Sequence, residues 1–166
     1  MAEKKYKYKI KQRIVYPSQG VGLITTIEER EFHGEKVPYY KVYLEVTDMT
    51  IMIPVNRADE LGLRPVVPAE DAQKALEFIS QDFEQSTADW KMRYQMNMEL
   101  LKKGTILDIA DIVRSLYHRS KVKELPIMER KLYESARKLF EEEIALALKK
   151  SRSDVEVIIH NHLENM

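Results

Sequence analysis

Residues 58–80, ADELGLRPVVPAEDAQKALEFIS, contain the point at which the hydrophobic pattern of the chain changes. Up to Pro65 the chain consists of short, β-branched and aromatic segments that are separated by turn residues. From Pro68 the apolar residues recur at helical spacing, and the acids that follow this proline are typical of a helix N-terminus. The sequence therefore predicts two domains, residues 1–66 and residues 67–166.

The N-terminal domain is expected to be built from strands. Segments 6–17, 21–31, 37–46 and 49–55 are rich in Val, Ile, Thr and Tyr, and HGEK at 33–36 is typical of a hairpin turn. Four or five short strands in about 60 residues suggest a small, strongly bent antiparallel β-barrel.

The C-terminal domain is expected to be helical. Apolar spacing predicts helices over 68–80, 89–103, 105–121 and 125–150, and a further short helix in 151–165. We interpret the glutamates 141–143 as a solvated helix face. The expected fold class is α+β, a β-barrel followed by a compact all-α domain.

Composition excludes several classes of protein. The 166 residues are 44% hydrophobic, carry no formal net charge and include no cysteine, which excludes disulfides and thiolate metal sites. We find neither a signal sequence nor an apolar run of the roughly 20 residues that a membrane span needs. A cytoplasmic protein that does not associate with membranes is expected.

Charge is distributed unevenly. Residues 67–89 contain one Lys/Arg and six Asp/Glu, whereas residues 90–131 contain ten and five. This basic segment begins at Trp90, the one tryptophan of the chain, which precedes Lys91 and Arg93. The indole is either part of the helical core or an exposed wedge for the minor groove of DNA, with cations on the phosphates. The candidate DNA-binding residues are Trp90, Lys91, Arg93, Lys102, Arg114, Arg119 and Arg130.

The segment DMTIMIPV, residues 48–55, is a candidate binding strand. Its apolar residues suit either a buried strand or an edge strand that pairs with a strand of a partner protein. Thr50, Ile51, Met52, Ile53 and Pro54 are therefore candidate partner-binding residues, and Arg30 is a candidate ion-pair donor to the same partner.

Signals of an enzyme are weak. His160 and His162 lie in the tail without further ligands, and no glycine-rich phosphate loop is found. His118, beside Arg119, is expected to face solvent or phosphate. We therefore expect a protein with no catalytic residues, no metal and no cofactor.

Three motifs carry a resemblance to a known family. VYPSQGVG at 15–22, LGLRPV at 61–66 and the spaced series Trp90, Arg93, Asn97 and Gly104 occur in order. Over residues 8–148 the chain resembles the CarD/CdnL family of bacterial transcription regulators, in its shorter, CdnL-like form.

The resemblance implies both a fold and a function. It implies a Tudor-like N-terminal domain that binds the β subunit of RNA polymerase, with Arg30 at a contact position. It also implies a helical domain on promoter DNA, where Trp90 enters the minor groove and stabilises the open complex, next to Lys91 and Arg93. Met52 stands where some members have a second arginine. The expected protein is a monomer that binds polymerase and promoter DNA; the alternative is a Tudor-like protein–protein adaptor without DNA contact.

Overall fold

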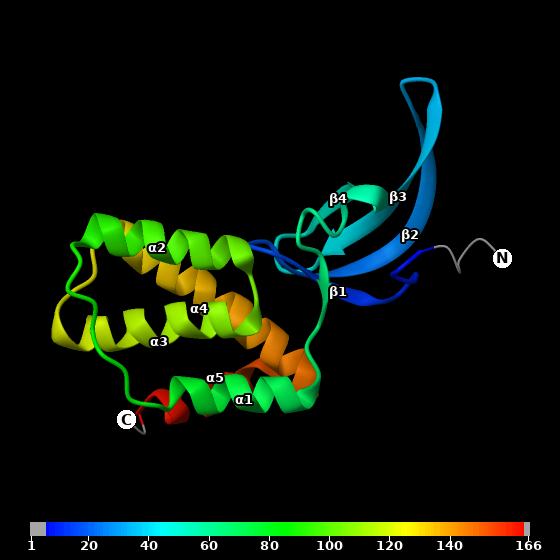
Figure 1. Cartoon of the computed structure of the whole chain (residues 1–166). Helices are drawn as coiled ribbons and strands as arrows, with labels where there is room; N and C mark the ends of the chain where they lie inside the picture. The colour runs from blue at the N-terminus through cyan, green and yellow to red at the C-terminus, as the bar shows by residue number, and fades with distance from the viewer. Residues whose placement is uncertain (1–5, 165–166) are drawn as a thin grey trace. The chain divides into compact units, whose positions relative to one another are not determined.

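The computed structural model describes residues 6–164. The chain divides into two compact units, Met1–Val66 and Val67–Met166. We name them the sheet unit and the helical unit (Figure 1). Each has a hydrophobic core of its own. No helix within residues 6–164 is long and apolar enough to cross a lipid bilayer.

The sheet unit is a five-stranded antiparallel sheet. Its strands lie in the order β4-β3-β2-β1-β5, so that β4 and the short β5 form the two edges. Ile14, Ile24, Tyr40 and Val42 fill its core. The elements are β1 (Arg13–Tyr16), β2 (Gly20–Phe32), β3 (Glu35–Leu44), β4 (Met49–Pro54), the 3-10 turn η2 (Val55–Arg57) and β5 (Arg64–Pro65).

Two backbone features shape the long β2–β3 hairpin. His33 and Gly34, with φ of 51° and 79°, form the two-residue turn between Phe32 and Glu35, and such turns require positive φ at both positions. At Gly22, a Cβ would come within 2.4 Å of the Val42 side chain, so glycine allows β2 and β3 to pack closely. The outer part of the hairpin extends beyond β4 (Figure 1).

The first expected strand is much shorter than the sequence indicates. Residues 6–17 alternate in hydrophobicity, but β1 spans only Arg13–Tyr16. Lys11 has a φ of 73°, and a turn between Lys9 and Gln12 ends the extended conformation there. Tyr8 is nevertheless buried, and its hydroxyl donates to the Leu63 carbonyl at 2.9 Å.

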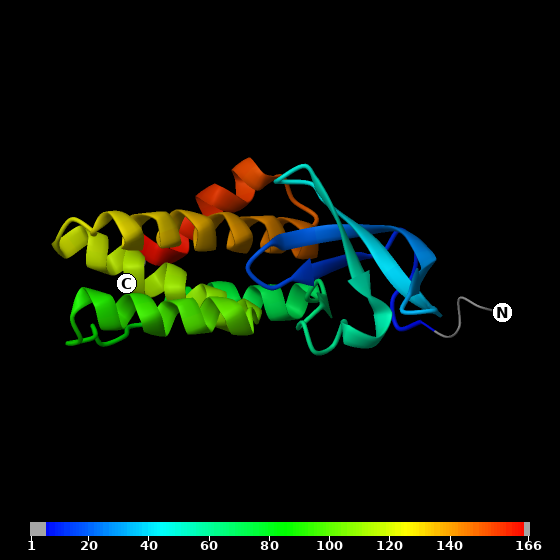
Figure 2. The same ribbon diagram turned by 90° about the horizontal axis from the view of Figure 1, so that it is seen from above.

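The helical unit contains five helices in its described residues. Gly104, with a φ of 69°, ends α2, and Thr105 caps α3 by accepting a hydrogen bond from the Asp108 amide. Figure 2 shows α2, α3 and α4 lying lengthwise beside one another. The helices are α1 (Ala69–Ile79), α2 (Trp90–Lys103), α3 (Ile106–Val122), α4 (Ile127–Leu148) and α5 (Arg152–Glu164). A Tudor-like antiparallel sheet before an all-α unit confirms the expected α+β class.

The glutamates 141–143 do not form a solvated face, so that interpretation was wrong. Glu141 and Glu143 are buried. Arg137 donates to the Glu141 carboxylate at 3.0 Å, and the Val67 amide donates to that of Glu143 at 3.0 Å. A buried carboxylate needs such partners, and the sequence does not show that the distant Val67 amide is one of them.

Candidate functional site

One end of the helical unit gathers three helix termini. The start of α2, the end of α3 and the start of α4 lie at the same end in both Figure 1 and Figure 2. We call this region the basic end, after the cations that these termini carry: Lys91, Arg119, Lys121, Lys123, Arg130 and Lys131. Within the described chain, Lys91, Arg119, Lys123 and Lys131 make no ion pair, so their charges are available to an external anion.

Trp90 is the first residue of α2 and lies at the basic end. The carboxylate of Asp89 caps the helix by accepting a hydrogen bond from the Met92 amide at 2.9 Å. Trp90 is 37% exposed and does not belong to the buried core. The Lys91 ammonium lies 5.9 Å from the centre of the indole ring. Trp90 is therefore not a core residue of the helical unit.

Arg93 lies inside the helical unit instead of on its surface. Its guanidinium donates two hydrogen bonds to the Glu129 carboxylate, at 2.7 and 3.1 Å, and a third to the Ala88 carbonyl at 2.9 Å. The side chains of Arg93 and Glu129 are 10% and 0% exposed. This ion pair connects the first turn of α2 to the first turn of α4. Sequence reasoning missed Glu129, because nothing local indicates a partner 36 residues away.

Arg114 is also an internal residue. Its guanidinium lies 4.0 Å from the centre of the Phe78 ring and 4.8 Å from that of Phe83. It donates to the Phe78 carbonyl at 3.1 Å and approaches Asp111 at 3.4 Å. Arg114 thus joins α3 to the end of α1 and to the connector that follows, by cation–π and polar contacts.

His118 faces the interior, contrary to its expected position toward solvent or phosphate. Its ring lies 5.5 Å from that of Phe83 and 5.1 Å from that of Tyr117. Its Nε2 atom is buried and has no hydrogen-bond partner within the described chain. Burial, followed by the nearby charges of Arg114 and Lys121, lowers the pKa of His118 below its usual value.

Of the remaining residues expected to contact DNA, Arg119 and Arg130 lie at the basic end and Lys102 does not. Arg119 lies in the last turn of α3, and Arg130, paired with Glu124 at 3.0 Å, lies in the first turn of α4. Lys102 lies twelve residues after Trp90, which is about 18 Å along a helix axis. It is therefore at the opposite end of α2, away from the basic end.

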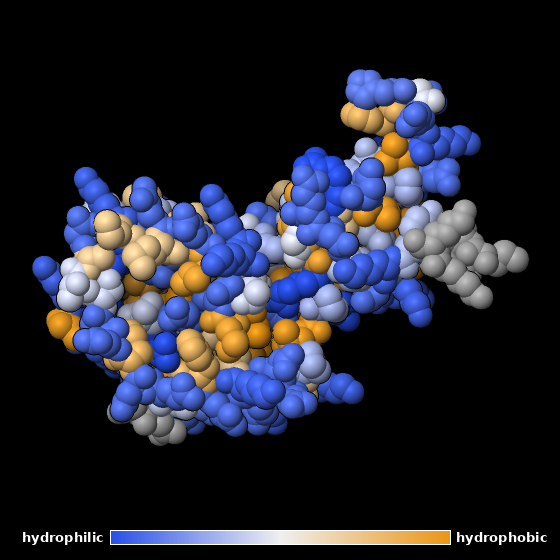
Figure 3. Space-filling model, in the orientation of Figure 1, coloured by the Kyte–Doolittle hydropathy of each residue, from blue (hydrophilic) through white to orange (hydrophobic). Residues whose placement is uncertain are grey.

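Exposed apolar side chains accompany these cations. Figure 3 shows a pale to tan apolar area over α2 among hydrophilic residues. Large exposed apolar residues here are Trp90, Met92, Met96, Val122, Ile127 and Met128. Apolar surface bordered by cations is a typical property of an interaction surface.

The expected partner-binding strand lies at a sheet edge. Among the described strands β4 pairs with β3 alone, and the register sets Met52 opposite Lys41 and Pro54 opposite Tyr39. Alternation directs Thr50, Met52 and Pro54 to the outer face of the sheet. Arg30 on β2 shares this face, on which it contacts Glu28 at 3.4 Å.

Ile51 and Ile53 belong to the opposite face of the same strand. Ile53 is buried in the core of the sheet unit, and Ile51 packs against that core. Their side chains are therefore not available to a partner, although their backbone lies at the edge.

Comparisons with known proteins cover both units. A family model described as "CarD-like/TRCF RID domain" matches residues 8–67, and one described as "CarD, C-terminal domain" matches residues 74–160. A protein of Bacillus subtilis (strain 168), named "Putative transcription factor YdeB", is 36% identical over 133 residues, which are 78% of this chain and 84% of the relative. The two family matches meet near the boundary between the two units.

Proposed function

Since the chain belongs to the CarD family of transcription regulators, we propose that it binds the β subunit of RNA polymerase through its sheet unit and stabilises the promoter open complex through Trp90. The RID family that matches the sheet unit is associated with interaction with RNA polymerase. The proposal assigns a separate task to each unit.

The observation that carries the proposal is the position of Trp90. It combines a partly exposed indole, the N-terminus of a helix and unpaired cations at one end of the helical unit. Apolar side chains that enter the minor groove unstack a base step, while cations hold the flanking phosphates. A helix N-terminus adds backbone donors for phosphate.

The roles of the individual residues follow from their placement. Trp90 is the wedge, and Lys91, Arg119 and Arg130 are phosphate contacts. Arg93 is a positioning residue, because its guanidinium is already bound to Glu129. The proposed surface excludes Arg114, which is internal, and Lys102, which is at the far end of α2.

On the sheet unit, the proposed polymerase contact is the edge strand β4. Its free backbone groups would pair with a strand of the β subunit. The side chains of Thr50, Met52 and Pro54, with Arg30, would meet the partner on the outer face. The ion pair between Arg30 and Glu28 is exposed, so exchanging Glu28 for a partner carboxylate costs little free energy.

Tethering explains how a chain without net charge can act on DNA. Binding to polymerase raises the effective concentration of the helical unit at the promoter, so high affinity for free DNA is not needed. Trp90 then favours the open complex only by its difference in affinity for the open and closed states.

The test is the lifetime of the open complex after addition of a competitor, measured with the wild-type chain and with Trp90→Ala. We expect a shorter lifetime for Trp90→Ala, about tenfold if the indole contributes 1.4 kcal/mol, with unchanged affinity for polymerase. Leu107→Ala is the matched control, since Leu107 is an exposed apolar residue near the start of α3, away from the basic end.

Equal lifetimes with the wild-type chain and with folded Trp90→Ala would contradict the wedge. The result would favour the adaptor alternative, in which the helical unit binds a protein.

A further inference from the structure

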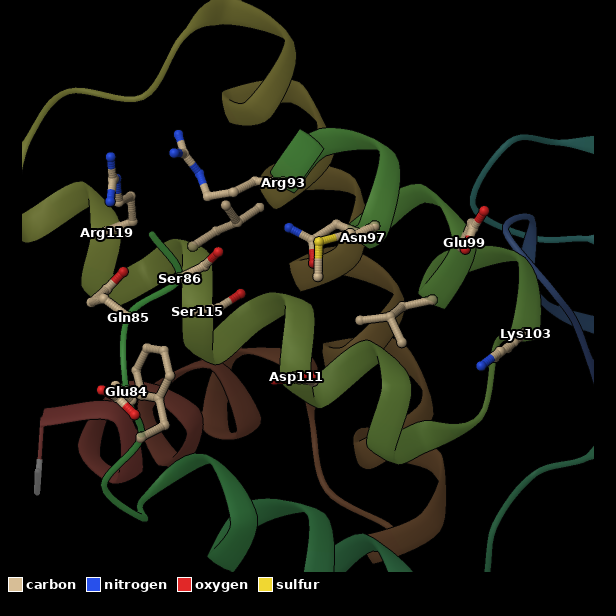
Figure 4. Close-up of a pocket in the computed structure, with 14 residues that line it drawn as sticks. Glu84, Gln85, Ser86, Arg93, Asn97, Glu99, Lys103, Asp111, Ser115 and Arg119 are labelled. Carbon is tan, nitrogen blue, oxygen red and sulfur yellow. The ribbon is translucent and has the colours of Figure 1, made fainter. Parts of the chain in front are cut away.

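A pocket of about 400 Å³ lies within the helical unit, between the connector after α1 and the helices α2 and α3. Figure 4 shows that Gln85 and Ser86 line it from the connector, Asn97 from α2 and Arg119 from α3. Its volume is in the range of sites for small ligands. The proposed wedge function does not use this pocket.

Asn97 is the pocket residue whose polar side chain has no partner within the described part of the fold. The residue is only 9% exposed, and its side-chain amide makes no hydrogen bond within the described chain. Figure 4 shows the amide among the pocket-lining side chains. The amide atoms are not among the buried polar atoms of the described chain that lack a partner, so they face solvent in the pocket and can pair with a bound ligand.

The other lining residues indicate the chemistry of such a ligand. Leu100, Leu116 and Met96 supply apolar surface. Figure 4 places the guanidinium groups of Arg93 and Arg119 toward the same end. Arg93 is neutralised by Glu129, whereas Arg119 makes no ion pair with any residue that the structure describes.

Carboxylates also line the pocket. Asp111 is near the Arg114 guanidinium at 3.4 Å, and Glu84 and Glu99 are exposed to solvent. Two lining cations, Arg119 and Lys103, make no ion pair within residues 6–164; Figure 4 shows them on opposite sides of the pocket, with Arg119 on the side of Ser86 and Gln85.

We propose that this pocket binds one unpaired nucleotide, with its base against the apolar wall, its edge on the Asn97 amide and its phosphate on Arg119. A side-chain amide offers a donor and an acceptor side by side, which matches the edge of a base. A guanidinium suits a phosphate. Asn97 lies seven residues after Trp90, about 10 Å along α2.

Two sources share this chemistry, a free nucleotide and a base of the separated promoter strands. The second source rests on the proposed function, because only an open complex supplies unpaired bases close to Trp90. The two arms of the experiment distinguish them.

The first arm uses the full chain without polymerase. The four deoxynucleoside monophosphates are titrated while the side-chain amide resonances of Asn97 are followed by NMR. Binding is also measured by calorimetry for Asn97→Leu and for the control Gln95→Leu, which changes an exposed amide of α2 outside the pocket. A free-nucleotide site predicts binding that Asn97→Leu reduces at least tenfold and that Gln95→Leu retains.

The second arm uses the open complex. 2-Aminopurine is placed in turn at each position of the upstream edge of the melted region, and its fluorescence is compared with the wild-type chain and both variants. A strand-derived base predicts quenching at one position that Asn97→Leu abolishes and Gln95→Leu retains.

A response in either arm supports the pocket and identifies its source; absence of an Asn97-dependent response in both arms overturns the proposal. If the proposed wedge function is wrong, the open-complex lifetime measured with Trp90→Ala will show it. That result does not affect the first arm, which uses neither polymerase nor DNA.

Discussion

Arg93 and Glu129 hold the residue on which the proposed function depends. Their two hydrogen bonds, at 2.7 and 3.1 Å, fix the first turn of α2 against α4 immediately after Trp90. A bidentate pair of this kind restricts orientation as well as distance. The first turn of α2, which carries Trp90, is thus held in place by a contact between residues 36 positions apart.

Glu129→Gln is expected to lower the free energy of unfolding by about 3–5 kcal/mol, because it leaves the buried Arg93 guanidinium without a counter-charge. The control Glu124→Gln breaks the exposed pair with Arg130 and should cost less than about 1 kcal/mol. Chemical denaturation followed by Trp90 fluorescence measures both. Equal losses in the two variants would mean that the buried pair does not stabilise the start of α2.

Residues differ in how far the sequence predicts their role. The position of Trp90 and Lys91 at the start of a helix could be predicted, because a lone indole at the start of a basic segment is a local pattern; their contact with DNA stays a proposal. Arg93 and Arg114 resemble surface cations in the sequence, since their partners, Glu129 and Phe78, come from distant segments. Asn97 cannot be distinguished from the other amides in the sequence, because its place in the pocket depends on how the helices pack.

At the scale of elements, β4 has two faces with different tasks. Met52 lies on the outer face, and Ile53 is buried in the core of the sheet unit. Met52→Asp should leave the sheet unit folded and weaken binding to polymerase about tenfold, if the added charge costs 1.4 kcal/mol at the interface. Polymerase pull-down titration and circular dichroism measure the two effects.

Ile53→Asp is the matched variant for the inner face. It buries a carboxylate in an apolar core and should unfold the sheet unit. If Met52→Asp binds polymerase as the wild-type chain does, the outer face of β4 is not the contact surface.

Helices, strands and turns could be predicted from the sequence where neighbouring residues determine them. Gly104 and the apolar spacing around it indicate where α2 ends and α3 begins, and His33 and Gly34 indicate the hairpin turn. The strand predicted over residues 6–17 was too long. Lys11 adopts a positive φ that ends the extended conformation, and a lysine in the sequence does not indicate such a backbone angle. Periodicity also could not show that Glu143 of α4 is buried, since the Val67 amide that donates to it lies outside that helix.

At the scale of the whole molecule, the two cores predict two unfolding transitions. The lone tryptophan belongs to the helical unit, so its fluorescence reports that unit, whereas far-ultraviolet circular dichroism reports both. Ile53→Ala, which should cost about 2–5 kcal/mol, is expected to shift one transition in circular dichroism and to leave the fluorescence midpoint unchanged. A single midpoint that moves in both signals would mean that the units unfold together.

The exposed thioethers beside Trp90 give this end of the molecule a chemical vulnerability. Met92, Met96 and Met128 are about half exposed, and the chain has no cysteine thiol to react with an oxidant in their place. Oxidation converts a flexible apolar side chain into a polar sulfoxide, which reductases can reverse. Met49 of the sheet unit is exposed to a similar extent, 51%. Peroxide would therefore modify thioethers in both units, and in the helical unit the apolar surface around Trp90 depends on the redox state of the cell.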